Sequence, residues 1–149
     1  MPDTMKFPET ADDVAREIFI SSDKSTELGD LRIRQLMHIL PKVNSELVIE
    51  GVIMVLENGT RPEQHSQDQE FAGKILERIN PKTEKGLKEL LLRALKNWDK
   101  SVEQFPFWLK DNYGLDKLRE TFSELELSEV EKDKLETIKW WLQLSKTNI

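Results

Sequence analysis

The sequence predicts an all-α fold of seven or eight short antiparallel helices, arranged as one helical domain over residues 1–149. Three observations support this fold class. Apolar residues recur at helical spacing along nearly the whole chain, and no segment shows a convincing strand pattern. Leu, Glu and Lys, which favour helix, are abundant. Pro, Gly and Asn interrupt the apolar pattern at points where short loops would join the helices.

The composition is that of a folded protein rather than a disordered one. The chain is 38% hydrophobic and 34% charged, and its 149 residues suffice for a sizeable core. It has no cysteine, which excludes disulfides, thiol nucleophiles and thiolate metal sites. The first ten residues do not resemble a signal peptide, and the longest apolar run, "LVIEGVIMVL", is too short to cross a bilayer. We therefore expect a cytoplasmic protein that does not enter a membrane.

The first three helices are expected to begin at residues 11, 31 and 45. The first follows Thr10, a plausible N-cap, and the second ends at Pro41, which disfavours helix in the residue before it. The stretch 21–30 between them is expected to be a loop or a frayed turn. The third helix ends near Asn58 and is apolar on nearly all sides, which predicts a position at the centre of the fold.

Five further helices complete the prediction. After a loop over 59–66, one helix uses apolar residues 71–79 and stops before Pro81, and the next runs from after Thr83 to Trp98. Another begins after Ser101, or at Pro106, and ends at Gly114. A short helix is expected over 115–122. The last begins after Ser128, where a Glu three residues on completes a capping box, and runs to about residue 144.

One segment recurs at a spacing of forty residues. "ILPKVNSEL" begins at Ile39 and "INPKTEKGL" begins at Ile79, and each stands between two predicted helices. Over residues 31–98 this pattern resembles the HEAT repeat family, which implies paired antiparallel helices stacked into a right-handed superhelix. The Asp and Arg usual in such repeats are not evident, since Arg93 meets Ile53 in the overlay. An irregular helical bundle is the alternative.

The sequence shows no catalytic or metal-binding constellation. No two glycines are spaced to cradle a phosphate, no serine stands in a nucleophile elbow, and no histidine pair has metal-ligand spacing. His65 has Glu63 and Asp68 near it, but one histidine on a polar loop is more typical of a solvated surface. We therefore expect neither an enzyme nor a cofactor or metal.

The aromatic residues are the best candidates for a binding surface. Phe107 and Tyr113 lie in an aromatic-rich segment, and Trp140 and Trp141 are adjacent, so on a helix their rings point about 100° apart. The candidate set is Trp98, Phe107, Trp108, Tyr113, Trp140 and Trp141. The set fills the core between the last helices or forms a partner-binding surface. The predicted function is a non-enzymatic protein–protein interaction module of adaptor, regulatory or inhibitor type, with another protein as partner and a homodimer possible.

A basic edge around residues 74–100 supports the alternative function, a nucleic-acid-binding or DNA-base-processing helical repeat protein. Its candidate residues are Lys74, Arg78, Lys85, Lys88, Arg93, Lys96 and Lys100. Glutamates are interleaved among them, as in ordinary helix ion pairing, and the net charge of −6 disfavours nucleic acid. A run of acids over 124–133 is expected to be a solvated helix start, with a patch for a basic partner as the alternative.

Overall fold

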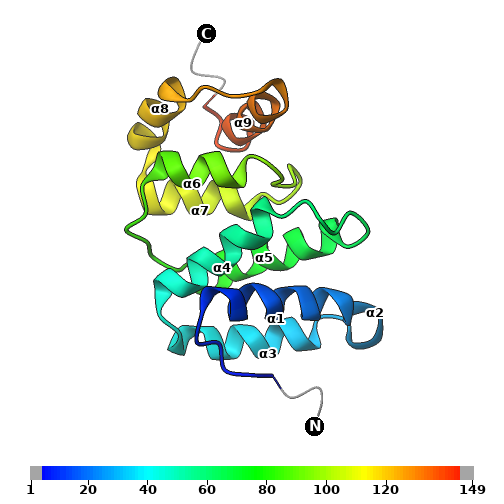
Figure 1. Ribbon diagram of the computed structural model, residues 1–149. Helices are drawn as coiled ribbons and strands as arrows, with labels where there is room; N and C mark the ends of the chain where they lie inside the picture. Colours follow the sequence, from blue (N-terminus) through cyan, green and yellow to red (C-terminus); the bar gives the residue numbers. More distant parts are fainter. Residues whose placement is uncertain (1–4, 145–149) are drawn as a thin grey trace.

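Nine α-helices and one short 3₁₀ turn form the secondary structure of residues 5–144, the part of the chain that the computed structural model describes (Figure 1). No strand occurs within this range, so the all-α prediction is confirmed. The helices are α1 (Ala11–Asp23), α2 (Ser25–Leu28), α3 (Leu31–Ile39), α4 (Ser45–Glu57), α5 (His65–Ile79), α6 (Leu87–Ala94), α7 (Gln104–Tyr113), α8 (Leu115–Glu124) and α9 (Glu129–Trp141), with the 3₁₀ turn at Leu40–Lys42. Within the described range, each helix is too short or too polar to cross a bilayer.

Several helix boundaries differ from the prediction. The four-residue helix α2 forms where a loop was expected, and α5 begins at His65, inside the predicted loop. The first turns of α5 are polar, but Asp68 and Gln69 are buried because they bond to neighbouring segments. Helix α7 begins at Gln104 without a side-chain cap, and Ser101, the expected cap, lies outside the helix and donates its hydroxyl to Asp99.

The helices stack in two rows. In one row α1 packs against α4, α4 against α6, and α6 against α8; in the other, α3 packs against α5, α5 against α7, and α7 against α9. Helix α1 also packs against α3, and α4 against α5, which ties the rows together. Figure 1 shows the resulting layers rising from the N-terminal end of the molecule to the C-terminal end. One continuous cluster of buried side chains runs through them from Val14 to Leu144.

Helix α4 lies at the centre of the N-terminal half, as its sequence predicts. Its residues Val48, Val52 and Val55 are buried, and α1, α5 and α6 cover it from different sides. Gly51 allows the closest of these approaches, since a Cβ built there would lie 2.5 Å from Cβ of Val14 on α1. A helix that is apolar nearly all round is thus enclosed by its neighbours.

The two Pro-Lys corners do not join closely packed helix pairs, which corrects the predicted pairing. The helices on either side of each corner, α3 with α4 and α5 with α6, make little contact with each other. Because α1 already covers α3, the chain after Pro41 steps up to the next layer instead of folding back. The two corners themselves lie side by side, where the hydroxyl of Ser45 donates to the carbonyl of Lys82 at 2.5 Å.

Candidate partner-binding surface

Two of the six candidate aromatic residues belong to the core. Trp98 is fully buried, lies 5.7 Å from the ring of Phe105, and donates its indole N–H to the carbonyl of Val102. Trp108 is only 3% exposed and donates its indole N–H to the carbonyl of Pro81 at 2.9 Å. The candidate assignment of Trp98 and Trp108 as surface contacts is therefore corrected, because these rings fill the space between helices.

Tyr113 is half-buried and also has a structural partner. Its hydroxyl donates to the carbonyl of Lys85 at 2.9 Å, and its ring meets that of Trp108 edge-on at 6.2 Å. Burial, with the nearby charge of Glu46, raises the pKa of Tyr113 to about 12. Together with the bond from Trp108 to Pro81, this contact fastens the end of α7 to the loop that follows α5.

The other three candidates form a connected group at the surface. Phe107 is 40% exposed and Trp140 is 61% exposed. Trp141 lies between them, with ring centroids 6.4 Å from Phe107 and 4.8 Å from Trp140. The indole N–H of Trp141 donates to the carbonyl of Lys100 at 3.0 Å, which fixes its orientation. Phe107, Trp140 and Trp141 are called the aromatic surface below.

Helix geometry explains why these rings remain exposed. On α7 the neighbours Phe105 and Trp108 point into the core, which leaves Phe107 on the outer side. On α9 the buried residues are Leu135 and Ile138. Trp140, two residues after Ile138, is about 200° away around the helix, so it faces away from the core.

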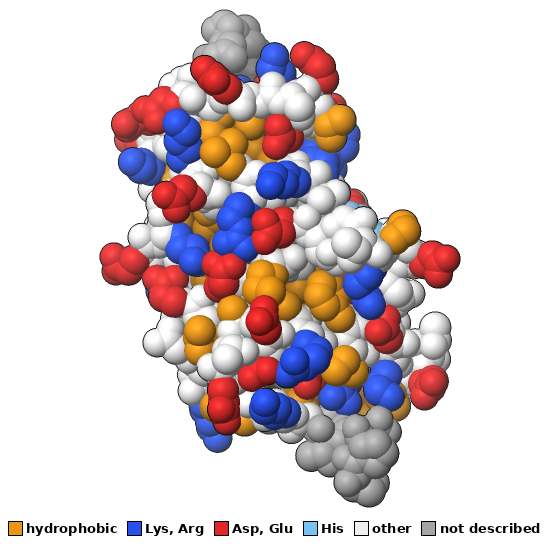
Figure 2. Space-filling view, in the orientation of Figure 1, with side chains coloured by type: hydrophobic (Ala, Val, Ile, Leu, Met, Phe, Trp, Pro, Cys, Tyr) orange, Lys and Arg blue, Asp and Glu red, His pale blue; other side chains and the backbone are white. Residues whose placement is uncertain are grey.

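The structure does not gather the predicted basic residues into one free edge. Lys85 pairs with Glu50 at 2.8 Å, Arg93 pairs with Glu50 and Glu57, and Lys100 pairs with Asp133. The other basic candidates are divided between the rows, with Lys74 and Arg78 on α5 and Lys88 and Lys96 on or just after α6. Figure 2 shows basic and acidic side chains interleaved over the visible face, without a field of one sign.

Three glutamates, Glu46, Glu50 and Glu57, form a narrow polar strip on the otherwise apolar helix α4 and have a structural role. Glu46 accepts from the hydroxyl of Thr83, and Glu50 and Glu57 both accept from Arg93 on α6. The hydrogen bonds from Arg93 hold the pKa of Glu50 down to about 2, and the two carboxylates raise the pKa of Arg93. The strip therefore joins one layer of the fold to the next.

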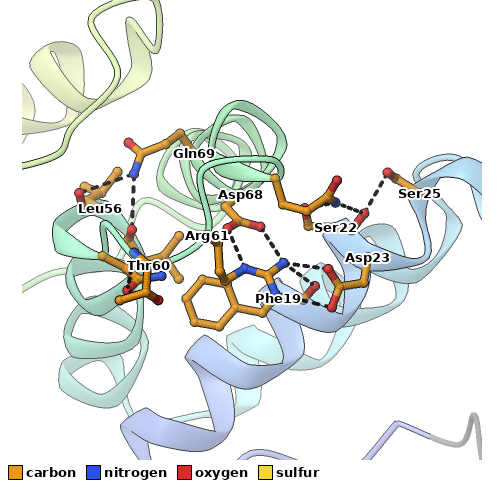
Figure 3. Close-up of polar contacts among 12 residues, drawn as sticks. Phe19, Ser22, Asp23, Ser25, Leu56, Thr60, Arg61, Asp68 and Gln69 are labelled. Atoms are coloured by element: carbon orange, nitrogen blue, oxygen red, sulfur yellow. Dashed lines mark hydrogen bonds and ion pairs between the residues drawn. The ribbon is translucent and has the colours of Figure 1, made fainter.

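A second arginine network holds the loop before α5 against α1 (Figure 3). Arg61 donates to Asp68 at 2.9 Å and to Asp23 at 2.6 Å, and its guanidinium lies 4.7 Å from the ring centroid of Phe19. These two carboxylates raise the pKa of Arg61. Asp68 is thereby engaged in an ion pair, so it is not a free ligand beside His65.

The acids at the start of α9 are used in several ways. Glu131 accepts from the backbone of Ser128 in the predicted capping box, Glu129 pairs with Lys132, and Asp133 pairs with Lys100. Glu124 and Glu126 are exposed at the end of α8 and in the following loop. These acids therefore fit the expectation of a solvated helix start, with Glu131 as its cap.

Sequence reasoning missed a small pocket next to the aromatic surface. It lies between α5 and α7, has a volume of about 260 Å³, and includes Phe107 in its wall. The remaining lining residues are Leu76, Glu77, Asn80, Glu103, Gln104, Trp108 and Asp111. The sequence signal for this pocket was the stripe Glu103–Phe107–Asp111, whose four-residue spacing places the three side chains on one face of a helix.

No protein-family model, curated protein or solved structure matches this chain, so its function is inferred from geometry.

Proposed function

We propose that the chain is a non-enzymatic protein-binding module on a HEAT-like helical scaffold, and that a partner protein contacts it at the aromatic surface. The observation that carries the proposal is a connected set of rings in which Phe107 and Trp140 are exposed and the half-buried Trp141 lies between them. Large exposed aromatic groups on a stable protein are typical of interaction sites, because partner binding removes them from water.

The rigidity of the aromatic surface supports this role. Phe107 lies on α7, which Trp108 and Tyr113 fasten to the loop after α5. Trp141 is fixed by its bond to Lys100, and α9 packs against α7. Rings held in place before binding lose little conformational entropy when a partner arrives, so more of the contact energy appears as affinity.

The arrangement of the layers supports the HEAT-like scaffold. Residues forty apart occupy matching places: α3 and α5 belong to one row, and α4 and α6 to the other. The two Pro-Lys corners lie side by side at one end of these helices, joined by the bond from Ser45 to Lys82. This is the relation expected of successive repeats that each contact mainly their neighbours.

A comparative pull-down tests the proposal. The wild-type chain and the double variant F107A/W140A are each used as bait, and bound proteins are quantified. Truncation of an aromatic hot-spot residue costs about 2 kcal/mol or more, so we expect the amount of a specific partner bound by the variant to fall at least about tenfold. Replacement of Val130, an equally exposed apolar residue on α9, by Ala is the matched control and should retain the partner.

Circular dichroism must first show that the variants are folded. Partners that bind the wild type, the F107A/W140A variant and V130A equally would contradict the proposal. Sedimentation velocity on the same three proteins tests the homodimer: a dimer that the double variant abolishes would make a second copy of the chain the partner.

The nucleic-acid alternative has less support, because Lys85, Arg93 and Lys100 are engaged in ion pairs.

A further inference from the structure

We infer that the pocket between α5 and α7 receives a lysine or arginine side chain of the partner protein. This inference rests on the proposed function, because the pocket shares Phe107 with the aromatic surface. Three carboxylates, Glu77, Glu103 and Asp111, line the pocket, and among residues 5–144 no Lys, Arg or His does. The aromatic rings of Phe107 and Trp108 complete it.

These carboxylates have no partner within the described part of the chain. Glu77, Glu103 and Asp111 are exposed, and none of them takes part in an ion pair or a side-chain hydrogen bond there, whereas the buried and half-buried acids at the helix interfaces do. The three like charges repel one another, although the water around these exposed side chains weakens the repulsion. A cation in the pocket relieves this repulsion and gains charge-assisted hydrogen bonds.

Two of the acids stand where they oppose helix stability. Glu77 lies in the last turn of α5 and Asp111 in the last turn of α7, close to helix ends that carry partial negative charge. An acidic side chain there is unfavourable, because its charge has the same sign as the helix end. Residues that break a local stability rule without a compensating intramolecular contact are expected at functional positions.

The size of the pocket and its aromatic wall narrow the class of ligand. Its volume of about 260 Å³ is below the roughly 300–1,000 Å³ of typical small-molecule sites, but it suits a single long side chain. A guanidinium or ammonium group near an aromatic ring is attracted by the negative face of the ring. The exposed rings on α7 and α9 would meet apolar residues next to that cation, so the expected motif is a cation beside a large apolar residue.

A second pocket, which shares Asn80 with the acidic one, is lined by basic residues instead. This pocket lies at the two Pro-Lys corners, and its basic residues are Arg78 and Lys82. The partner is therefore expected to place its cation specifically between α5 and α7, and a uniformly polycationic segment would be repelled at the corners.

Titration of the ¹⁵N-labelled protein with three dipeptides tests the inference. The probes are acetyl-Trp-Arg-amide, the neutral isostere acetyl-Trp-citrulline-amide and acetyl-Trp-Glu-amide. The indole N–H signals report position: Trp108 lines the pocket, Trp140 and Trp141 mark the aromatic surface, and Trp98 is a buried reference. We expect the arginine probe to shift Trp108 and to bind about fivefold more tightly than the citrulline probe, and the glutamate probe to bind most weakly.

Two variants of equal charge separate a local site from general electrostatics. E77Q/D111N should remove the preference for arginine while leaving the protein as stable as before or more so, since it also removes unfavourable helix-end charges. E124Q/E126Q removes the same charge from exposed positions elsewhere and should keep the preference. Equal binding of the arginine and citrulline probes, or equal loss of preference in both variants, would overturn the inference.

The same spectra distinguish this inference from the proposed function. Shifts of Trp140 and Trp141 with all three probes, without a shift of Trp108, would reject the pocket and leave the aromatic surface in place. If no probe moves any of these signals, the pocket inference is wrong, and the pull-down alone then decides the proposed function.

Discussion

At the scale of single residues, charge in this protein serves two separate purposes. Most buried or half-buried carboxylates, such as Glu50 and Asp68, accept from an arginine, and Arg93 and Arg61 use such pairs to join neighbouring segments of the fold. Glu77 and Asp111 are exposed, have no such pairing within residues 5–144, and line a pocket. The contrast separates charges that hold the fold from charges that are available to a partner.

The clearest residue-scale prediction concerns Arg93. Its replacement by Gln removes the bonds to Glu50 and Glu57, and we expect the free energy of unfolding at pH 7 to fall by about 1–2 kcal/mol. The pKa of Glu50 is lowered to about 2 in the folded state. Its stabilisation is therefore present above its ordinary pKa of 4.5, and is lost as the pH falls towards 2.

Urea denaturation at pH 7, 4 and 2.5 measures this effect. The difference in unfolding free energy between wild type and R93Q should shrink steadily over that series. K132Q, which breaks the exposed pair with Glu129, is the control and should change stability by less than about 0.5 kcal/mol at every pH. A difference for R93Q that does not depend on pH would show that Arg93 acts through packing alone.

The aromatic residues show what could and could not be predicted at this scale. Their abundance and the adjacent pair Trp140–Trp141 indicated that some rings would be exposed, and the structure confirms this for Phe107 and Trp140. The sequence could not assign Trp98 and Trp108 to the core. Their burial depends on acceptors, the carbonyls of Val102 and Pro81, that only the folded chain brings to the indole N–H groups.

At the scale of helices, close approach depends on small residues in the right places. Gly51 in α4 faces Val14 in α1, where an added Cβ would lie 2.5 Å from the Cβ of Val14 and 3.0 Å from the carbonyl of Ala11. Glycine within a helix costs about 1 kcal/mol relative to alanine. Here that cost is offset because α1 and α4 can pack closely.

We therefore expect G51A to destabilise the protein, although alanine is the better helix former. Because α1 must shift away, the free energy of unfolding should fall by about 1–3 kcal/mol, as in other overpacked cores. Gly86 has open space around its Cβ position, and it is the N-cap of α6. The loss of a better N-cap residue and the gain from a less flexible unfolded chain oppose each other, so G86A should change stability by less than about 1 kcal/mol. Thermal denaturation compares the two, and equal effects would mean that the contact with Val14 does not limit packing.

The helices themselves were largely predictable, but their partners were not. Apolar periodicity and caps identified α1, α3, α4 and α9 to within a few residues, because these signals are local. The start of α5 was missed because Asp68 and Gln69 are polar yet buried by bonds to Arg61 and to the carbonyl of Val55. The pairing across the Pro-Lys corners was wrong, since it depends on which apolar stripes meet in space.

At the scale of the whole molecule, stability is expected to vary along the stack. Helix α4 buries seven residues, among them Val48, Ile49 and Val52, whereas α8 and α9 together bury five. In a stack in which each layer contacts mainly its neighbours, the layer with the least buried apolar surface opens first. The C-terminal layer, which carries Trp140 and Trp141, should be the weakest.

Native-state hydrogen exchange in low denaturant measures these openings. We expect the amides of α8 and α9 to exchange through a partial opening whose free energy is about 1–2 kcal/mol lower than that of global unfolding. The amides of α4 should exchange only when the whole protein unfolds. Helix α1 is the reference at the opposite end of its row, and it should follow α4 because Gly51 lets the two helices pack closely.

Binding at the aromatic surface should then slow exchange in α9 more than in α1, because a partner that contacts only the folded layer shifts its opening equilibrium. Uniform protection of α1, α4 and α9 would instead show that the layers unfold as one cooperative unit.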